Sequence, residues 1–426
     1  MIFDEIDQRQ RLKWAFANCK NGAWGEEPDG ENDAVCIRAA DFDGQLGRLN
    51  NGERTLRSLD QKTFDKIALR EGDVIIEKSG GGEKQLVGRA VLFQGGEPSF
   101  TSNFLARCRP AEGVDPSFLN YLMLAIYNGR GTYPHIKQST GIQNLDLASF
   151  LDIKVKMPSL ETQRRIAQFL DEKTARIDGL IEKKRALLDR LAEKRQALIT
   201  RAVTKGLNPE APMKPSGIDW LGDIPSHWDV RGLTKCTTRV DYRGATPTKS
   251  AEGVFLVTAR NIKNGQIDYE VSQEFIPEEE YAHVMRRGKP KIGEVLFTTE
   301  APLGEVARVD NEGIALAQRI IKFSSSIEQL TNDYLAYWMY SSLFQRDVLS
   351  RATGSTALGI KASKIVELKC LLPPEVEQKE ISDLLDADAE KRNDVIKEIG
   401  KSIALLEEYR SAVITAAVTG QIGELQ

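Results

Sequence analysis

Two long segments of the chain carry hydrophobic residues at the spacing of an α-helix. The first, residues 160–204, contains no proline and one glycine, Gly179. Its apolar and lysine positions step alternately by four and three, the pattern of a coiled-coil seam with charged interruptions. A helix of about 45 residues spans about 65–70 Å at 1.5 Å per residue. The predicted pairing positions on this helix are Ile166, Leu170, Ile177, Leu180, Leu187, Leu191 and Leu198.

The second segment, from about residue 376 to 419, repeats the first in unbroken register 215 residues later. Matched pairs include Pro158 and Pro373, Gln163 and Gln378, Asp171 and Asp386, Arg195 and Arg410, and Thr204 and Thr419. A repeat of this length indicates two copies of one architectural unit. The pairing positions predicted on the second helix are Ile381, Leu385, Val395, Ile399, Leu406 and Val413.

The segments before and between these helices have a mixed pattern. Short β-type runs at 35–37, 73–76 and 90–93 are broken by glycine-rich turns, and a helix is expected over 116–127. The second segment repeats this order of parts at 255–260, 293–297 and 333–343, with much looser sequence similarity. We therefore predict an α+β fold, in which two similar mixed α/β domains are separated by two long helices that form an antiparallel coiled coil.

The predicted boundaries follow from these patterns. They are 1–157 for the first mixed domain, 158–206 for the central helix, 207–217 for a proline-rich linker, 218–372 for the second mixed domain, 373–420 for the C-terminal helix and 421–426 for a tail.

Charge favours pairing of the two helices with each other. Residues 161–205 hold twelve basic and seven acidic residues, whereas 376–420 hold six basic and ten acidic ones. Oppositely charged helices attract, and two copies of either helix would repel. The alternative is that each helix packs on its own domain. The basic residues of the first helix could face the second helix, DNA or water. They are Lys183, Lys184, Arg185, Arg190, Lys194 and Arg195.

Composition changes this picture little. The 426 residues carry a net charge of -4, which neither indicates nor excludes a polyanionic partner, because a local basic face decides phosphate binding. The five cysteines are scattered and never form a C-x-x-C pair, which favours reduced thiols in the cytoplasm. No apolar run approaches the length of a membrane span, and no secretory leader is visible.

The sequence offers no catalytic or metal-binding motif. Its three histidines, His135, His227 and His283, are far apart and lack the spacing of a metal site. The run from Gly80 to Gln85 lacks the G-x-x-x-x-G-K-[ST] frame of a phosphate-binding loop, so a turn or hairpin tip is expected there. We predict a non-catalytic chain that binds neither metal nor cofactor.

Three stretches nevertheless resemble a known family. Residues 216–230, with the sequence SGIDWLGDIPSHWDV, are similar to the opening sequence of target-recognition domains in specificity subunits of type I restriction–modification systems. The ends of both mixed domains also resemble the family, with a small-residue turn at 139–142 and 353–356, a strand ending at Pro158 or Pro373, and a Gln-led helix start. The likeness covers essentially the whole chain, except that the first domain lacks the opening sequence and begins at 2–16.

This resemblance implies a DNA reader without activity of its own. Each target-recognition domain would read one half of a split, asymmetric sequence in double-stranded DNA. The paired helices would set the gap and dock two modification subunits, which bind S-adenosylmethionine and methylate adenine, and motor-nuclease restriction subunits would join for cleavage. Two rival hypotheses remain: a coiled-coil scaffold that binds proteins, and a stand-alone endonuclease or methyltransferase.

Polar and basic residues in the loops of each mixed domain are the candidate DNA contacts. Phosphates require cations, and base edges are read by Arg, Lys, Asn and Gln. The candidates in the first domain are Lys78, Ser79, Lys84, Arg89, Tyr133, His135, Lys137 and Gln138. Those in the second are Tyr242, Arg243, Thr298, Thr299, Gln318, Arg319 and Arg351.

Overall fold

The structure, a computed structural model, describes residues 9–82, 85–139, 141–244, 247–355 and 357–425. The chain divides into two compact units: unit 1 comprises residues 1–184 and 400–426, and unit 2 comprises residues 185–399. Both cuts fall at the same position of the 215-residue repeat, between 184 and 185 and between 399 and 400. Each unit therefore holds one mixed domain, part of helix α4 (Leu160–Lys205) and part of helix α10 (Glu375–Val418).

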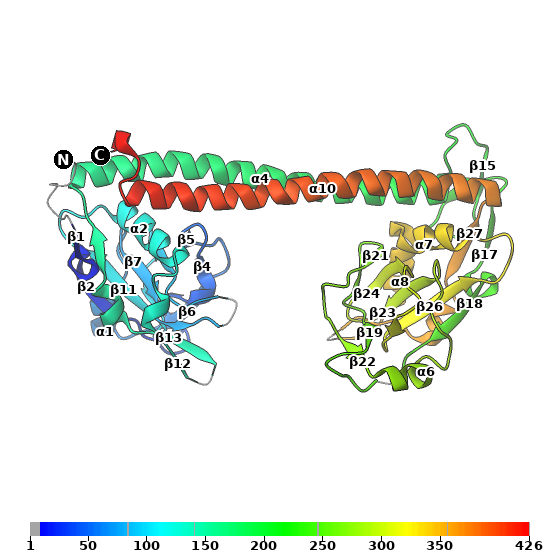
Figure 1. Cartoon of the computed structure of the whole chain (residues 1–426), viewed down its shortest axis with the longest axis horizontal. Helices are drawn as coiled ribbons and strands as arrows, with labels where there is room; N and C mark the ends of the chain where they lie inside the picture. The colour runs from blue at the N-terminus through cyan, green and yellow to red at the C-terminus, as the bar shows by residue number, and fades with distance from the viewer. Residues whose placement is uncertain (1–8, 83–84, 140, 245–246, 356, 426) are drawn as a thin grey trace. The chain divides into compact units, whose positions relative to one another are not determined.

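Unit 1 is built on a six-stranded sheet with the strand order β2-β11-β7-β9-β5-β4 (Figure 1). Its strands are β2 (Phe16–Asn21), β4 (Phe42–Asp43), β5 (Arg48–Leu49), β7 (Val74–Glu77), β9 (Ala90–Leu92) and β11 (Leu105–Pro110). A two-stranded sheet joins β1 (Arg9–Arg11) to β14 (Lys154–Lys156). In one three-stranded sheet β3 (Asp33–Ile37) lies between β10 (Ser99–Thr101) and β6 (Thr55–Ser58), and in another β13 (Ile142–Leu145) lies between β12 (Ile136–Ser139) and β8 (Ser79–Gly80). Its short helices are η1 (Leu12–Ala15), η2 (Ala39–Asp41), α1 (Gln61–Ile67), α2 (Pro116–Asn128), η3 (Tyr133–His135), α3 (Leu147–Leu151) and η5 (Gly423–Leu425).

One core in unit 1 joins the sheet to the long helices through α2. This helix begins at Pro116, and its cap Asp115 accepts a hydrogen bond from the Phe118 amide at 2.9 Å. Buried residues of α2 share a hydrophobic cluster with Val74 of the sheet, with Leu170 near the start of α4 and with Ile414 near the end of α10. The predicted helix at 116–127 is thus confirmed, and it carries the mixed domain on the long helices.

Unit 2 repeats this plan around a four-stranded sheet with the order β18-β26-β23-β24. Its strands are β18 (Thr237–Asp241), β23 (Val295–Thr299), β24 (Leu303–Arg308) and β26 (Ile320–Ser325). The smaller sheets join β15 (Met213–Pro215) to β16 (Asp223–Pro225), β17 (Asp229–Gly232) to β27 (Lys369–Leu372), β19 (Val254–Val257) to β22 (Phe275–Ile276) and β25 (Ala315–Leu316), and β20 (Ile262–Lys263) to β21 (Gln266–Ile267). Its short helices are α5 (Leu233–Cys236), η4 (Glu278–Glu280), α6 (Tyr281–Val284), α7 (Asn332–Tyr340), α8 (Ser342–Ser350) and α9 (Ala362–Ile365).

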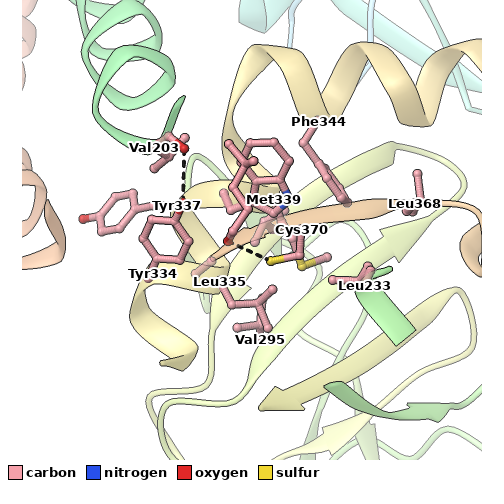
Figure 2. Close-up of a cluster of buried hydrophobic side chains, with 14 of the residues drawn as sticks. Val203, Leu233, Val295, Tyr334, Leu335, Tyr337, Met339, Phe344, Leu368 and Cys370 are labelled. Carbon is pink, nitrogen blue, oxygen red and sulfur yellow. Dashed lines mark hydrogen bonds between the residues drawn. The ribbon is translucent and has the colours of Figure 1, made fainter. Parts of the chain in front are cut away.

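The core of unit 2 gathers side chains from α7, α8, the sheet and the last turns of α4 (Figure 2). Tyr334 of α7 is fully buried, and its hydroxyl donates to the Val203 carbonyl of α4 at 3.1 Å. Ile381 and Leu385 of α10 belong to the same cluster. The segment predicted as one helix at 333–343 is two helices, because Ser341 leaves the helical conformation and caps α8 by accepting from the Phe344 amide.

The same buried glutamine begins both long helices. Gln163 accepts from the amide of Asp115, the cap of α2, at 2.8 Å and donates to the Pro158 carbonyl at 2.8 Å. In unit 2, Gln378 accepts from the amide of Thr331, the cap of α7, at 2.9 Å and donates to the Pro373 carbonyl at 2.8 Å. Each glutamine therefore ties the first turn of a long helix to the first turn of the helix that carries the mixed domain.

A buried tyrosine and an aspartate form a second repeated contact. The Tyr121 hydroxyl donates to Asp171 at 2.7 Å, and the Tyr337 hydroxyl donates to Asp386 at 2.6 Å. Burial raises the pKa of both tyrosines, so both hydroxyls stay protonated at neutral pH. These contacts explain why the repeat is unbroken in the helices: the matched residues bind the mixed domains as well as the partner helix.

The opening sequence of the second domain has a structural role at the start of α10. Glu377 in the first turn of α10 accepts hydrogen bonds from the indole of Trp228 at 3.0 Å and from His227 at 2.8 Å. A carboxylate is favourable at a helix N-terminus. In unit 1, which lacks this sequence, Ile422 and Leu425 of the C-terminal tail pack against the core. The expected start of the first domain at 2–16 lies partly outside the described residues.

The predicted seam is buried near the start of each long helix and is partly wrong further along. Of the predicted residues, Ile166, Leu170, Ile177, Ile381, Leu385 and Ile399 are buried, and Leu191, Leu198, Leu406 and Val413 are half-buried. In contrast, Leu180, Leu187 and Val395 are 42%, 45% and 47% exposed. The buried positions lie one residue later, at Thr174 and Ile181 in α4 and at Arg410 in α10. From Leu170 the buried residues are therefore spaced by four, three and four, at Thr174, Ile177 and Ile181.

Within each unit the two long helices share a core with the mixed domain, so helix pairing and packing on the domain occur together. The early part of α4 lies with the late part of α10 in unit 1, and the reverse holds in unit 2, which is the antiparallel arrangement. An ion pair between the two helices in unit 1 joins Arg410 of α10 to Asp178 of α4 at 2.9 Å. Its polarity is opposite to the net charges of the two helices.

We predict that Gln378→Ala lowers the free energy of unfolding of unit 2 by about 2–3 kcal/mol, because it removes the buried partner of the Thr331 amide and of two carbonyls. Urea denaturation followed by tryptophan fluorescence measures this, since Trp228 and Trp338 are buried in unit 2. Lys379→Ala, on the exposed face of the same turn, is the control and should leave the midpoint unchanged. Equal effects of the two substitutions would contradict the role of Gln378.

Candidate nucleic-acid interface

In each unit, the central strand of the main sheet ends at an edge where three chain segments meet. In unit 1 the Lys78 amide donates to the Phe104 carbonyl at 2.9 Å, and the Leu145 amide donates to the Lys78 carbonyl at 2.8 Å. In unit 2 the Thr299 amide donates to the Arg319 carbonyl at 2.8 Å, and the Ile360 amide donates to the Thr299 carbonyl at 3.0 Å. Lys78 and Thr299 therefore occupy equivalent positions. We call these two places the reading edges of units 1 and 2.

Most of the residues predicted in the first domain gather at the reading edge of unit 1, around the β12–β13 hairpin. Ser79 lies in β8 beside Asn144 of β13, and its hydroxyl donates to the Asn144 side chain at 2.7 Å. Lys78 donates from Nζ to the Asn21 side chain at 2.7 Å, and burial lowers its pKa. Residues 21, 78 and 144 are thus brought together by the sheet.

The hairpin and the short helix η3 before it carry the remaining candidates. Lys137 and Gln138 lie exposed on β12, and Lys137 pairs with Asp146 at 2.7 Å. Tyr133 is 60% exposed, and its ring lies beneath the Arg130 guanidinium at 5.5 Å. His135 forms a 2.7 Å hydrogen bond with Ser149. This edge therefore presents amides, cations and an exposed aromatic ring, the groups that contact bases and phosphates.

Two candidates in the first domain fall elsewhere. Arg89 forms a two-pronged ion pair with Glu77 at 2.9 Å, with side chains 13% and 2% exposed, and this pairing raises the pKa of Arg89. The Arg89 guanidinium is nearly buried and stabilises the sheet beneath the edge, so the prediction of Arg89 as a DNA contact is wrong. Lys84 lies outside the described residues. Nearby, Gly82 and Gln85 are bridged, as expected for a turn.

The reading edge of unit 2 is hollowed by three neighbouring cavities. The largest, about 430 Å³, is lined by His283, Arg286 and Arg287 near α6. Pro247 also borders a cavity of about 190 Å³ that contains Lys249, Arg260, Gln318 and Arg319. A third, of about 240 Å³, lies between Arg243, Glu300 and Lys361. Basic side chains outnumber acidic ones along these walls, which suits a polyanion.

Three polar candidates in the second domain are buried, and their prediction as DNA contacts is wrong. Thr298 and Thr299 are 0% and 1% exposed, and their hydroxyls bond the backbone of Glu305 and Arg319. Tyr242 is buried, donates to the Gly288 carbonyl and has its pKa raised by burial. A threonine on a central strand satisfies its hydroxyl within the sheet, which residue type alone does not reveal.

The predicted arginines of the second domain differ in how firmly ion pairs hold their side chains. Arg351 pairs with Asp347 at 3.0 Å and with Glu367, so it holds α8 to the segment after α9. Arg243 is bound by Asp241, which raises the pKa of Arg243, and it donates to the Ile360 carbonyl at 3.0 Å. Arg319 pairs with Glu300 at 2.8 Å, and both side chains are nearly half exposed. Of the predicted arginines, Arg319 is the one best placed to contact a ligand.

None of the three histidines takes part in a ligand set. His227 contacts Glu377, His135 contacts Ser149, and His283 contacts Arg286. Across the described ranges, no group of three His, Cys, Asp or Glu side chains could hold a metal ion. The same part of the chain contains no helix long and apolar enough to cross a membrane.

Comparison with known proteins identifies the family. The family of type I restriction modification DNA specificity domains matches residues 31–190 and again residues 250–404. The chain belongs to this family. The two matches confirm the resemblance to this family; they include both domain ends, whereas residues 216–230 lie between the matched ranges.

Two relatives come from Methanocaldococcus jannaschii. The MjaVIII type I restriction enzyme specificity subunit is 25% identical over 67% of this chain and 66% of its own length. The putative MjaX specificity subunit is 22% identical over 86% of this chain and 82% of its own length. A chain from a solved type I restriction–modification system has the same fold, with a TM-score of 0.68 at 15% identity over 97% of this chain and 98% of that one.

Comparing the two units of this family member identifies residues at the reading edges that residue type alone did not predict. Superposing the hydrogen-bond registers of the two edges matches Asn21 with Asp241, Lys78 with Thr299, Ser79 with Glu300, Phe104 with Arg319 and Asn144 with Gly359. Phe104 is 49% exposed. Asn21, Phe104 and Asn144 were missed because only register, which the sequence leaves open, places them beside Lys78. His283, Arg286 and Arg287 were missed because their cavity forms only in the fold.

Arg89 and Lys137 provide a paired test of structural and surface roles. We predict that Arg89→Ala costs about 3–5 kcal/mol of stability, because it leaves the Glu77 carboxylate buried without its partner. Lys137→Ala should leave the unfolding midpoint unchanged but weaken DNA binding and lower the slope of log K against log salt by about one. Denaturation and salt titration of DNA binding by the assembled complex distinguish them. A midpoint insensitive to Arg89→Ala would contradict the assignment.

Proposed function

We propose that this chain is the DNA-reading subunit of a type I restriction–modification complex and that its two units read different halves of a split, asymmetric target. The proposal rests on a contrast between two parts of each unit: the frame, meaning the residues that join the mixed domain to the long helices, and the reading edge. The residues that dock the long helices are the same in both units, whereas all five matched edge positions differ in chemical type. Two like frames with unlike edges suit a protein that presents two different base sequences to one machinery.

The reading edges suit double-stranded DNA in particular. Each combines exposed cations, which bind phosphates, with side chains that pair with base edges in the major groove. In unit 1 these base-pairing groups are amides of Asn and Gln, and in unit 2 they include arginine and glutamine.

Catalysis is assigned to other subunits. Two modification subunits, each binding S-adenosylmethionine and methylating adenine, would dock on the specificity subunit, and restriction subunits would join through them. The location proposed is the cytoplasm, where the five cysteines, all free thiols here, would stay reduced. On this view the chain has no activity alone.

The first test is methylation of host DNA. Co-expression with its modification subunit is expected to produce methylated adenines in one bipartite, non-palindromic motif, mapped by whole-genome detection of methyladenine. The matched control lacks this chain and should lack that motif. Methylation at a continuous palindrome would defeat the bipartite assignment, and absence of DNA binding by the assembled complex would favour a protein scaffold.

The second test asks whether the length of the long helices sets the distance between the two half-sites, that is, whether the helices act as a ruler. Deleting residues 182–188 together with 397–403 removes matched heptads from α4 and α10 and so keeps the seam in phase. Seven residues correspond to about 10 Å, or about three base pairs. We expect a motif whose spacer is shorter by about three base pairs, or loss of methylation. Deletion from α4 alone should abolish methylation, and an unchanged spacer would rule out the ruler.

A further inference from the structure

Arg319 occupies an unusual position at the reading edge of unit 2. Its φ angle is +79°, a region that residues with a side chain rarely adopt. Two hydrogen bonds hold it there, because its carbonyl accepts from the Thr299 amide at 2.8 Å and from the Thr299 hydroxyl at 3.1 Å. Strained backbone that is held in this way is typical of functional sites.

In this conformation the Arg319 side chain lies at the surface. It is 46% exposed, whereas the next residue, Ile320, and Ala317 two residues before it are buried. It lines the cavity of about 190 Å³ together with Gln318, Lys249 and Arg260. The fold thus presents the Arg319 guanidinium at a concave surface with three cations and one carboxylate, that of Glu274, which pairs with Lys249 at 2.8 Å.

The partner of Arg319 is exchangeable. Glu300 holds its Nε at 2.8 Å, but both side chains are nearly half exposed, and such surface pairs contribute little to stability. A ligand that offers two acceptors in one plane can replace the carboxylate. The major-groove edge of guanine offers this pair in O6 and N7, and arginine bound in bidentate fashion to these atoms is the commonest specific contact to DNA.

The equivalent position in unit 1 cannot make this contact. Phe104 replaces Arg319 there and carries no hydrogen-bonding group on its side chain. The Ser79 amide donates to the Phe104 carbonyl at 3.2 Å, and the Ser79 hydroxyl bonds the amide side chain of Asn144. Amide side chains pair with adenine rather than guanine. The difference between the two edges is therefore a difference in the base that each can read.

We infer that Arg319 is a specificity-determining residue that reads a guanine in the half-site bound by unit 2. The inference rests on the proposed function, since it supposes that unit 2 binds duplex DNA. Beyond the proposed function, the inference names the base that is read, the residue that reads it and the half-site in which it lies. A phosphate contact by the same guanidinium is the competing role.

The experiment compares Arg319→Gln and Arg319→Ala with the parent chain in the assembled methyltransferase complex. The readouts are the methylated motif and binding to duplexes that carry each base at every position of the half-site. We expect Arg319→Ala to lose discrimination at a single guanine by about 5- to 150-fold. Arg319→Gln should favour adenine at that position, because glutamine pairs with adenine N6 and N7. The other half-site should not change.

Arg231→Gln is the matched control. Arg231 lies on β17, outside the three cavities, and its side chain is also 46% exposed, so the substitution removes the same charge from unit 2 without touching the reading edge. Its motif should equal that of the parent. A uniform loss of affinity for all duplexes in Arg319→Ala, with a salt slope lower by about one, would assign a phosphate contact and overturn the inference.

The outcomes also separate this inference from the proposed function. If the parent complex methylates no bipartite motif, the proposed function fails. If the parent motif is bipartite and Arg319→Ala leaves discrimination in both halves unchanged, only the reading role of Arg319 fails. Arg319→Gln and Arg319→Ala both retain the hydrogen bonds with Thr299, because these involve only the backbone carbonyl of residue 319. Circular dichroism of the purified complex checks that both variants fold.

Discussion

A buried glutamine at the start of each long helix ties that helix to a mixed domain, and the rest of the structure depends on this contact. Gln163 and Gln378 each bridge the cap of a domain helix and the proline that precedes the long helix. A buried amide that uses both its oxygen and its nitrogen has one acceptable orientation, since any other leaves polar groups without partners. The contact therefore defines the angle at which each domain leaves its helix. Hydrophobic packing alone, which has little directional preference, would not define that angle.

Further polar contacts of the long helices explain why a seam interrupted by charges is stable. Thr174 and Arg410 are buried at seam positions because they bond the mixed domain or the partner helix, Thr174 with Tyr121 and Arg410 with Asp178. Arg410 also donates to the Gln45 carbonyl at 2.8 Å, as its repeat mate Arg195 does to the Asn264 carbonyl. The helices are thus parts of two composite cores, and each half obtains its stability from the domain that it carries.

A common frame leaves the reading edges free to differ. Beneath the edge of unit 1 lies the ion pair of Glu77 and Arg89, whereas Thr298 and Glu305 occupy the same positions in unit 2, where burial raises the pKa of Glu305. Both solutions satisfy the buried polar groups, so the strands keep the same course while the exposed positions change. This is why similarity between the two halves is close in the helices and loose in the domains.

Residue patterns predicted the fold well and the site only in part. Strand and helix order followed from periodicity, and the edge of unit 1 from the candidates Lys78, Ser79, Lys137 and Gln138. The seam phase was wrong at Leu180, Leu187 and Val395, because spacing records hydrophobicity and not which face of the helix is covered; next to the exposed Leu180, Ile181 is the buried residue. Thr298 and Thr299 were misassigned because an inward and an outward threonine look alike in a sequence.

The sequence by itself determined the duplication, the two long helices and the membership of a DNA-specificity family, since each depends on local spacing or on an extended motif. Only the tertiary structure decided which polar residues face outward. That choice depends on strand register, which shifts every side chain to the other face when it slips by one residue. Register placed Phe104 and Arg319 at one equivalent position, and the fold holds Arg319 at a positive φ through its hydrogen bonds with Thr299 while its side chain lies at the surface.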